Sequence, residues 1–346
     1  MKTIYSLLLA SIGAVGASAQ TQYDAFRFSE NELNGTARFV GMGGAMGALG
    51  ADISVIGTNP AGIGLFRGHD LSTSFSFNST NVKSDFNGVS MSEKKNHMSY
   101  DQLGFVYSTK IGNRTNVRYI NFGFNYHKSN NLNKLFSAGG FLDGMSQTNQ
   151  MANMMSGWST TDFDNIYNYG TDLDKGLANP YDPYDSNYPY LGVMGIRTEL
   201  VGVGANGTPV GWYGNKNYYH SREEGGIQQY DFNVSFNVQD KMYFGATFGV
   251  YDIDYRRSTF YSEDIFDNTN GADHEGYYEM NNIHRTSGTG IDLKLGAIFR
   301  PIDDSAFRFG FAIHTPTWYN LTDTYDSNIY TEIAYKFSDG RTSSFK

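Results

Sequence analysis

Apolar and polar residues alternate along much of the chain beyond residue 70. In 230-YDFNVSFNVQ-239, aromatic or aliphatic residues occupy every second position up to Val238, and polar residues fill the positions between them. Because successive residues of a strand point to opposite faces of a sheet, this period of two predicts strands with one apolar and one polar face. With seven further stretches of the same kind, the pattern predicts about eight strands: 71–77, 102–108, 119–128, 230–239, 242–250, 290–299, 305–315 and 329–337.

The connections between these strands distinguish two all-β architectures, a soluble β-sandwich and a membrane β-barrel. The predicted strands reach about 9–11 residues, which is the length that crosses a bilayer at a tilt. Short turns such as Asp240-Lys241 and 301–305 alternate with long polar connections, at 78–101, 129–229, 256–289 and 315–328. Short turns at one end and long loops at the other are typical of outer-membrane barrels. We therefore predict an all-β fold, an antiparallel transmembrane barrel over 71–346, with 129–229 as its largest outer loop and the sandwich as the alternative.

The same alternation predicts which residues face the interior of such a barrel. Apolar residues are placed toward lipid and polar residues inward, so that His127 and His314 face the interior. The charged residues expected to point inward are Asp252, Asp254, Arg256 and Arg257. Tyrosines near strand ends suit the aromatic girdles at the membrane surfaces, namely Tyr107, Tyr126, Tyr230, Tyr251 and Tyr255.

The first residues have the composition of a secretory signal peptide. Lys2 supplies a positive charge, an apolar core runs from Leu7 to Val15, and Ala17-Ser18-Ala19 is a small-residue cleavage signal. We expect residues 1–19 to be removed on export. Together with the predicted barrel, this indicates the outer membrane of a Gram-negative bacterium.

Composition excludes several other classes of function. The chain of 346 residues has no cysteine, which excludes disulfides and thiol catalysis. A net charge of -9 argues against a nucleic-acid partner, which would require a basic face. The acidic stretches 180–190 and 264–275 lack the ligand spacing of a calcium loop and are interpreted as surface loops. Because the chain has no local Ser/His/Asp arrangement, we expect no enzyme. We also expect no metal and no cofactor.

A glycine-rich stretch, 41-GMGGAMGALGADISVIGTNPAGIG-64, precedes the first predicted strand. It does not match a dinucleotide-binding loop because Met46 stands where the third glycine belongs, and it lacks the Gly-Lys-Ser/Thr of a P-loop. The stretch also does not suit a membrane helix, because Asp52 and Pro60 interrupt it.

A position inside the barrel explains this composition better. Backbone packed within a barrel must approach the wall closely and satisfy its own polar groups, which favours small residues. Asp52 and Asn59 can bond to neighbouring backbone, and Pro60 fixes a turn. We therefore interpret residues 20–70 as a plug.

The order of motifs in 36–66 resembles the N-terminal hatch of the FadL/TodX family of outer-membrane long-chain fatty acid transporters. A Gly/Ala-rich stretch is followed by Asp52-Ile53-Ser54-Val55 and then by the turn Asn59-Pro60-Ala61. The resemblance implies a barrel closed on its periplasmic side by the hatch, with Asp52, Asn59, Pro60 and Ala61 in gating.

The resemblance also implies a route for the substrate. Outer loops would capture a long-chain fatty acid or another hydrophobic small molecule and pass it to an internal apolar pocket. It would leave laterally, through an opening in the wall beside a kinked strand, into a membrane of lipid and lipopolysaccharide. Because some relatives are described as haemin receptors, a haemin-binding receptor or an adhesion barrel is the alternative function.

A candidate capture site lies in 135-LFSAGGFLDGMSQTNQMANMM-155, whose apolar residues follow a partly helical pattern. Methionine adapts to varied ligands, which suits an acyl chain. The candidate residues are Phe136, Phe141, Leu142, Met145, Met151, Met154 and Met155. The alternative is that these side chains pack a loop helix onto the barrel rim.

The predicted strand number is small for such a transporter. About eight strands form a narrow barrel that side chains fill, which leaves no space for a plug. The chain also ends in a polar stretch at Lys346 rather than on a strand with a terminal aromatic residue. We therefore expect the complete barrel to contain more strands than this sequence.

Overall fold

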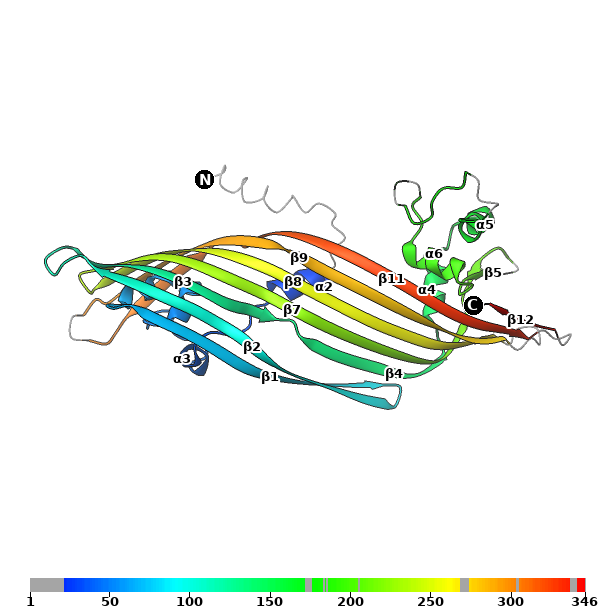
Figure 1. Ribbon diagram of the computed structural model, residues 1–346, viewed down its shortest axis with the longest axis horizontal. Helices are drawn as coiled ribbons and strands as arrows, with labels where there is room; N and C mark the ends of the chain where they lie inside the picture. The colour runs from blue at the N-terminus through cyan, green and yellow to red at the C-terminus, as the bar shows by residue number, and fades with distance from the viewer. Residues whose placement is uncertain are drawn as a thin grey trace.

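The computed structural model describes residues 22–171, 176–182, 184, 186–204, 206–267, 274–302, 305–336 and 341–345. The predicted signal peptide, residues 1–19, lies outside the described residues. Within them, an antiparallel sheet of ten strands forms the body of the molecule (Figure 1). The strands are β1 (Asp70–Phe86), β2 (Val89–Lys110), β3 (Val117–Asn131), β4 (Lys134–Gly144), β7 (Tyr213–Val238), β8 (Met242–Asp267), β9 (His274–Phe299), β10 (Phe309–His314), β11 (Trp318–Lys336) and β12 (Thr342–Phe345).

The sheet follows the order β1-β2-β3-β7-β8-β9-β11-β12, with β4 added to β7 and β10 added to β9. In the part of the chain that the structure describes, β1 and β12 are the two ends of this path, so the sheet is curved and open. The predicted antiparallel β architecture is confirmed, whereas closure into a barrel stays a prediction.

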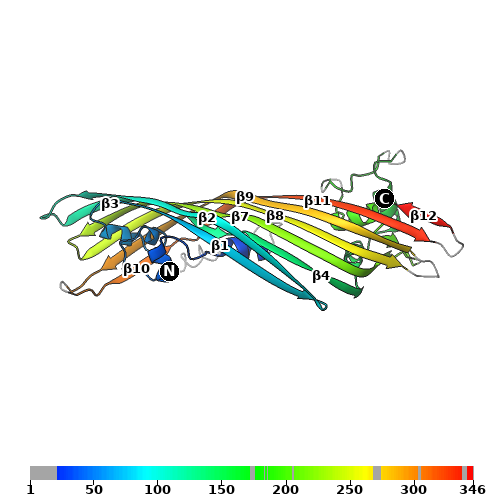
Figure 2. The same ribbon diagram turned by 60° about the horizontal axis from the view of Figure 1, so that its bottom comes forward.

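Short helices lie toward the two ends of the long strands (Figure 2), and α2 (Gln22–Ser29) lies near their middle (Figure 1). The N-terminal segment, defined here as residues 26–66, contains the end of α2 (Gln22–Ser29), α3 (Ala37–Gly41) and the 3-10 helices η1 (Ile53–Gly57) and η2 (Pro60–Leu65). The sheet face against which it packs is called the inner face, and the opposite one the outer face. The cap, residues 145–212, contains α4 (Gln147–Met154), α5 (Thr160–Asn168), α6 (Tyr190–Arg197), β5 (Gly202–Val203) and β6 (Pro209–Val210).

Among the described residues, no helix has the length and apolar character needed to span a membrane.

The strands are much longer than the sequence pattern predicts. β7, β8 and β9 contain 26 residues each, or about 85 Å at the usual rise of a strand. The predicted long loops 78–101, 256–289 and 315–328 are therefore mostly strand. β1 and β2 continue to a tight turn at Asn87 and Gly88, whose φ values of 47° and 81° suit a hairpin turn. These extensions were missed because both of their faces carry many polar residues, which removes the apolar contrast that marks a strand.

The outer face is apolar over only part of each long strand. Its outward side chains are exposed, as in Phe232 (51%), Phe122 (48%) and Leu293 (42%). The last apolar row toward the cap runs in register across four strands and consists of Tyr230, Val250, Ile291 and Trp318. The next outward row is polar in all four strands and consists of Gln228, Asp252, Thr289 and Asn320. We call the region from the first of these rows to the short turns the apolar band.

Beyond the band the two faces exchange character. Tyr251, Ile253 and Tyr255 lie on the inner face and are 6%, 1% and 0% exposed. They pack with Phe28 of α2 and Ile227 of β7. This arrangement is that of a water-soluble sheet, with its apolar side covered.

Two predictions of orientation are therefore wrong. Asp252, Asp254 and Arg256 are exposed on the outer face rather than pointing inward. Tyr251 and Tyr255 are buried on the inner face and belong to no girdle. The prediction assumed one register rule for the whole strand, and the apolar side changes after Val250.

Candidate functional site

The N-terminal segment packs closely against glycines of the inner face. A Cβ added at Gly104, Gly245 or Gly296 would lie 2.6 Å from Ile53, 2.4 Å from Pro60 or 2.0 Å from Asn59. Gly245 and Gly296 face each other in the β8–β9 register, so they form one shallow site for η2. No larger residue fits there without moving the segment. The sequence predicted that small residues of the segment allow it to approach the wall closely. In the structure, glycines of the wall allow this close approach as well.

The turn Asn59-Pro60-Ala61 forms the start of η2. Asn59 is 3% exposed, and its side-chain oxygen accepts a hydrogen bond from the Ala61 N–H at 3.2 Å. Its Nδ2 donates to the Gly47 carbonyl at 2.6 Å, which ties η2 to the glycine-rich stretch. The predicted local hydrogen bonding of Asn59 is present, and the gating roles of these three residues stay a prediction.

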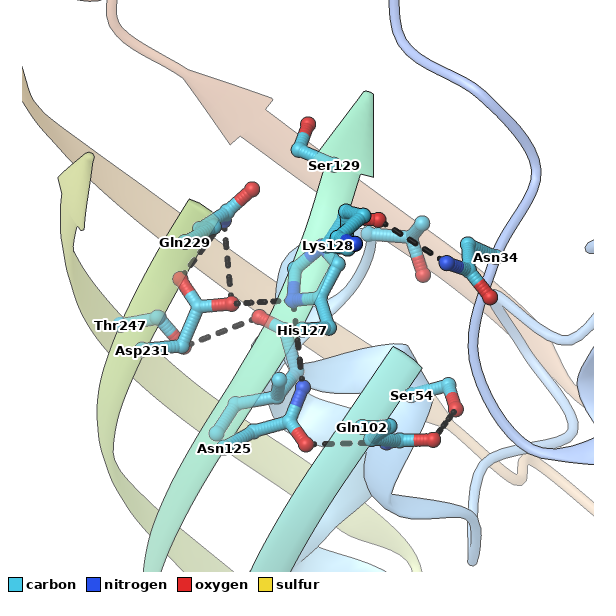
Figure 3. Close-up of polar contacts among 12 residues, drawn as sticks. Asn34, Ser54, Gln102, Asn125, His127, Lys128, Ser129, Gln229, Asp231 and Thr247 are labelled. Atoms are coloured by element: carbon cyan, nitrogen blue, oxygen red, sulfur yellow. Dashed lines mark hydrogen bonds and ion pairs between the residues drawn. The ribbon is translucent and has the colours of Figure 1, made fainter. Parts of the chain in front are cut away.

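Asp52 begins a chain of hydrogen bonds from the segment into the wall. Its side chain caps η1 by accepting from the Ser54 N–H at 3.0 Å. Ser54 Oγ donates to Gln102 on β2 at 3.2 Å, and Gln102 Nε2 donates to Asn125 on β3 at 2.9 Å (Figure 3). The segment is therefore fixed to two strands by buried polar groups as well as by packing.

A buried charge cluster lies beside this chain of bonds. Asp231 is fully buried, accepts two hydrogen bonds from Gln229 (Figure 3), and lies 3.3 Å from Lys294 Nζ. Lys294 also pairs with Asp292 at 2.8 Å, and Tyr251 donates to that carboxylate at 2.7 Å. Together with Thr58 and other residues of the segment, Gln229, Tyr251, Asp292 and Lys294 line a cavity of about 420 Å³. Such pairs are costly to disrupt, because removal of one charge leaves the other buried.

Both interior histidines contact protein groups. His127 and His314 lie on the inner side, as predicted. His314 Nε2 is 2.9 Å from the Thr58 carbonyl, and His127 Nδ1 is 3.3 Å from Asn125 Nδ2 and 3.7 Å from Asp231.

The wall is discontinuous between β2 and the strands that follow. The described β2–β3 ladder ends at Gln102 and His127. β3 ends at Asn131, and β4 continues along β7 from Lys134. Side chains bridge the two sides where the ladder is missing. Lys128 Nζ donates to Ser99 Oγ at 3.0 Å, and Asn131 Nδ2 lies 2.7 Å from His97 Nε2.

The predicted capture residues do not surround one cavity. Met151 and Met155 are fully buried in the core of the cap, and Leu142 is 7% exposed. Gly192 of α6 would place a Cβ 2.4 Å from Met155 Sδ, so α4 and α6 are in close contact. Met151 and Met155 therefore serve to pack the helix, which was the alternative to a capture site. The other predicted residues lie apart from this core: Phe141, Met145 and Met154 are exposed, and Phe136 packs on Tyr219.

A larger apolar cavity lies between α6 and the inner face of β9 and β11. Its volume is about 1020 Å³. Leu191, Met194 and Tyr190 line it from the cap, and Met280 and Ile329 line it from the wall. We call it the capture cavity. The sequence pattern missed it because most of its wall residues, Met280 among them, fall in the predicted loops 256–289 and 315–328, and Ile329 only begins the next predicted strand.

The only guanidinium lining the capture cavity in the described part of the chain serves the structure of the cap. Arg197 Nη1 donates to the carbonyl oxygens of Ile166 and Tyr167 at 3.2 Å each, and also to that of Tyr169. Basic groups at a helix C-terminus satisfy its last carbonyls in this way. Arg197 thereby holds the end of α5 against α6.

Comparison with family models gave no match, and comparison with curated proteins gave none either. Among solved structures, the chain is similar to the CymD monoaromatic hydrocarbon channel, with a TM-score of 0.17 and 9% identity over 87% of this chain and 98% of that chain. A likeness of this size gives no basis for assigning a function.

Proposed function

We propose that this chain forms part of an outer-membrane channel through which hydrophobic compounds enter the cell, with long-chain fatty acids as the substrate class to test first. The observation that carries the proposal is the apolar band on the outer face. On β7 it runs from Tyr230 to Val238. At ~3.4 Å per residue and a tilt of ~40°, this segment rises ~21–23 Å, close to the ~25 Å apolar belt of membrane barrels.

An aromatic row supports the placement of the membrane boundary. Phe75, Tyr100, Tyr126 and Tyr230 follow one another across four strands, with ring centroids 5.0, 5.8 and 5.4 Å apart. Amphipathic rings are favoured at the interface between lipid and water. The extended strands and the cap would then lie outside the membrane, where a hydrophobic compound is first met.

The capture cavity is the proposed first binding site. Burial of an acyl chain against Leu191, Met194 and Met280 would contribute roughly 0.8 kcal/mol for each methylene removed from water. From there the compound would enter the space under the cap. The N-terminal segment would act as the hatch. No catalytic step is required.

Membrane insertion is tested with a pair of lysine substitutions on the outer face. Val234→Lys places a charge within the apolar band and should cost about 2–4 kcal/mol, while Thr289→Lys in the polar row should cost less than about 1 kcal/mol. The measurement is the heat-modifiable folded fraction in outer membranes of cells that express the full-length gene product. Equal folded fractions for the two variants would contradict the proposed boundary.

Transport is tested by uptake of labelled oleate in cells that lack the gene, with and without the complete protein. Leu191→Asp should reduce uptake several-fold, whereas Tyr184→Asp, on a side chain that is 97% exposed, should not. Unchanged oleate uptake together with new haemin binding would favour a haemin receptor instead.

A further inference from the structure

A further cavity, of about 400 Å³, lies between the cap and the ends of β8, β9 and β11 and is separate from the capture cavity. Met194 and Arg197 of α6 line the capture cavity, whereas Ile196 and the following Glu199 line this one. The remaining walls include Phe163 and Tyr167 of α5, Trp212, and Tyr335 of β11. Its size falls in the range of ordinary small-molecule sites.

Hydrogen bonds to Glu199 hold the aromatic walls in place. Tyr167 donates to one carboxylate oxygen at 2.9 Å, and Tyr335 donates to the other at 2.5 Å. Trp212 Nε1 donates to the Glu199 carbonyl at 2.9 Å. The Trp212 and Tyr335 rings are 6.1 Å apart, and His274 meets Tyr335 edge-on at 5.3 Å. The rings are thus positioned before any ligand arrives, which lowers the entropy cost of binding.

The charge of the lining is mainly negative. Three carboxylates line the cavity, from Asp164, Glu199 and Asp267, and His274 is the one basic residue among its described lining residues. Arg197 lies nearby but donates to carbonyl oxygens of α5. The hydrogen bond to Glu199 raises the pKa of Tyr167, so this phenol stays a neutral donor at physiological pH.

These features favour one class of ligand. Both oxygens of Glu199 already accept a tyrosine hydroxyl, so the carboxylate contributes mainly a local negative potential. Aromatic faces, with tryptophan the strongest, attract weakly hydrated organic cations through their quadrupoles. A hard inorganic cation would instead require several oxygen ligands directed at one point.

We propose that this cavity, the ammonium cavity, binds an organic ammonium group such as that of a trimethylammonium compound. The proposal does not depend on transport of hydrophobic compounds, because it concerns another cavity and another chemistry.

The test compares choline with its uncharged isostere 3,3-dimethyl-1-butanol. The complete protein is purified in a maltoside detergent, since phosphocholine detergents would compete, and titrated by calorimetry. Choline should bind saturably and at least about 10-fold more tightly than the isostere, because the charge contributes most of the attraction.

Two substitutions should weaken choline binding by about 10-fold each, Glu199→Gln through the charge and Trp212→Leu through the ring. Met194→Ala, in the capture cavity, is the matched control and should leave choline affinity unchanged. Heat-modifiable migration confirms that each variant is folded. Equal affinity for choline and the isostere, absence of saturable choline binding, or retention of wild-type affinity in folded variants at both positions would overturn the proposal.

Discussion

Replacing Gly296 with alanine tests how strongly the N-terminal segment depends on close approach to the wall. The new Cβ would lie 2.0 Å from Asn59 Oδ1, 2.9 Å from the Ala61 nitrogen and 3.0 Å from Pro60 Cδ. Two of these atoms belong to the backbone or a proline ring and cannot rotate away, so η2 must shift. Overpacking of this kind costs about 1–3 kcal/mol. The ladder of β9 is unchanged, so the cost falls on docking of the segment and should raise its undocked population about 5- to 150-fold.

The assay is limited trypsin digestion of the folded complete protein. Arg38 lies in α3, and cleavage after it requires that part of the segment to open. When opening is fast compared with cleavage, the rate follows the open population. Gly68→Ala is the matched control, because Gly68 has no atom within 4 Å of an added Cβ. It should leave the rate unchanged, whereas Gly296→Ala should raise it at least about 5-fold.

Equal cleavage rates for the two variants would refute the reasoning. A double-mutant cycle makes the result specific to the contact. Asn59→Gly removes the nearest clashing atom, so Gly296→Ala should cost less in that background than alone. Additive effects would show that Asn59 and Gly296 are not coupled.

Three further predictions concern the cap and the buried charges. Met155→Ala should lower the free energy of unfolding by about 2–5 kcal/mol in urea denaturation, while Met154→Ala, 39% exposed, should change it by less than about 0.5 kcal/mol. The Ser159 hydroxyl lowers the pKa of Asp162, so this carboxylate stabilises the start of α5 above its unfolded-state pKa, and the contribution disappears as pH falls through the lower folded-state pKa. Protease resistance of the cap, compared across acidic pH, should lose this dependence in Asp162→Asn. Lys294→Met leaves two buried carboxylates without their cation and should cost about 3–5 kcal/mol in the same urea assay; a smaller loss than for Met154→Ala would contradict the ion-pair assignment.

The parts of the fold that could be read from sequence are those with a strong contrast between neighbouring positions. Within the band, Phe232 and Val234 alternate with Asp231 and Asn233, and the structure places these pairs on opposite faces as predicted. Outside the band that contrast fades, and β1 continues as strand through 78–86 on mostly polar residues, with Val82 and Phe86 as the exceptions. There the ladder depends on backbone hydrogen bonds, which carry little sequence signal, and on the Asn87-Gly88 turn, whose hairpin composition the prediction did not use.

The candidate site was harder to predict from the sequence than the strands were, for a related reason. Asn59 and Asp52 could be identified because each caps a local helix, and capping depends on residues close in sequence. The capture cavity instead joins α6 to Met280 and Ile329, which are far from it in the chain, and Met280 lay in a segment predicted as a loop. Met151 and Met155 were instead predicted as capture residues and are core residues of the cap. An apolar helical pattern indicates burial, but it does not indicate whether protein or a ligand covers the side chains.

The exchange of faces after Val250 links these observations to the proposed function. A sheet in lipid carries apolar residues outside, whereas a sheet in water places them inside. In this chain both arrangements occur along the same long strands. The change from one to the other falls at one register level on β7, β8, β9 and β11. A soluble sandwich has no physical reason for such a change, because water surrounds the whole of its outer surface. A membrane boundary at that level, as proposed above, would give the outer face a different environment on its two sides and so accounts for the change.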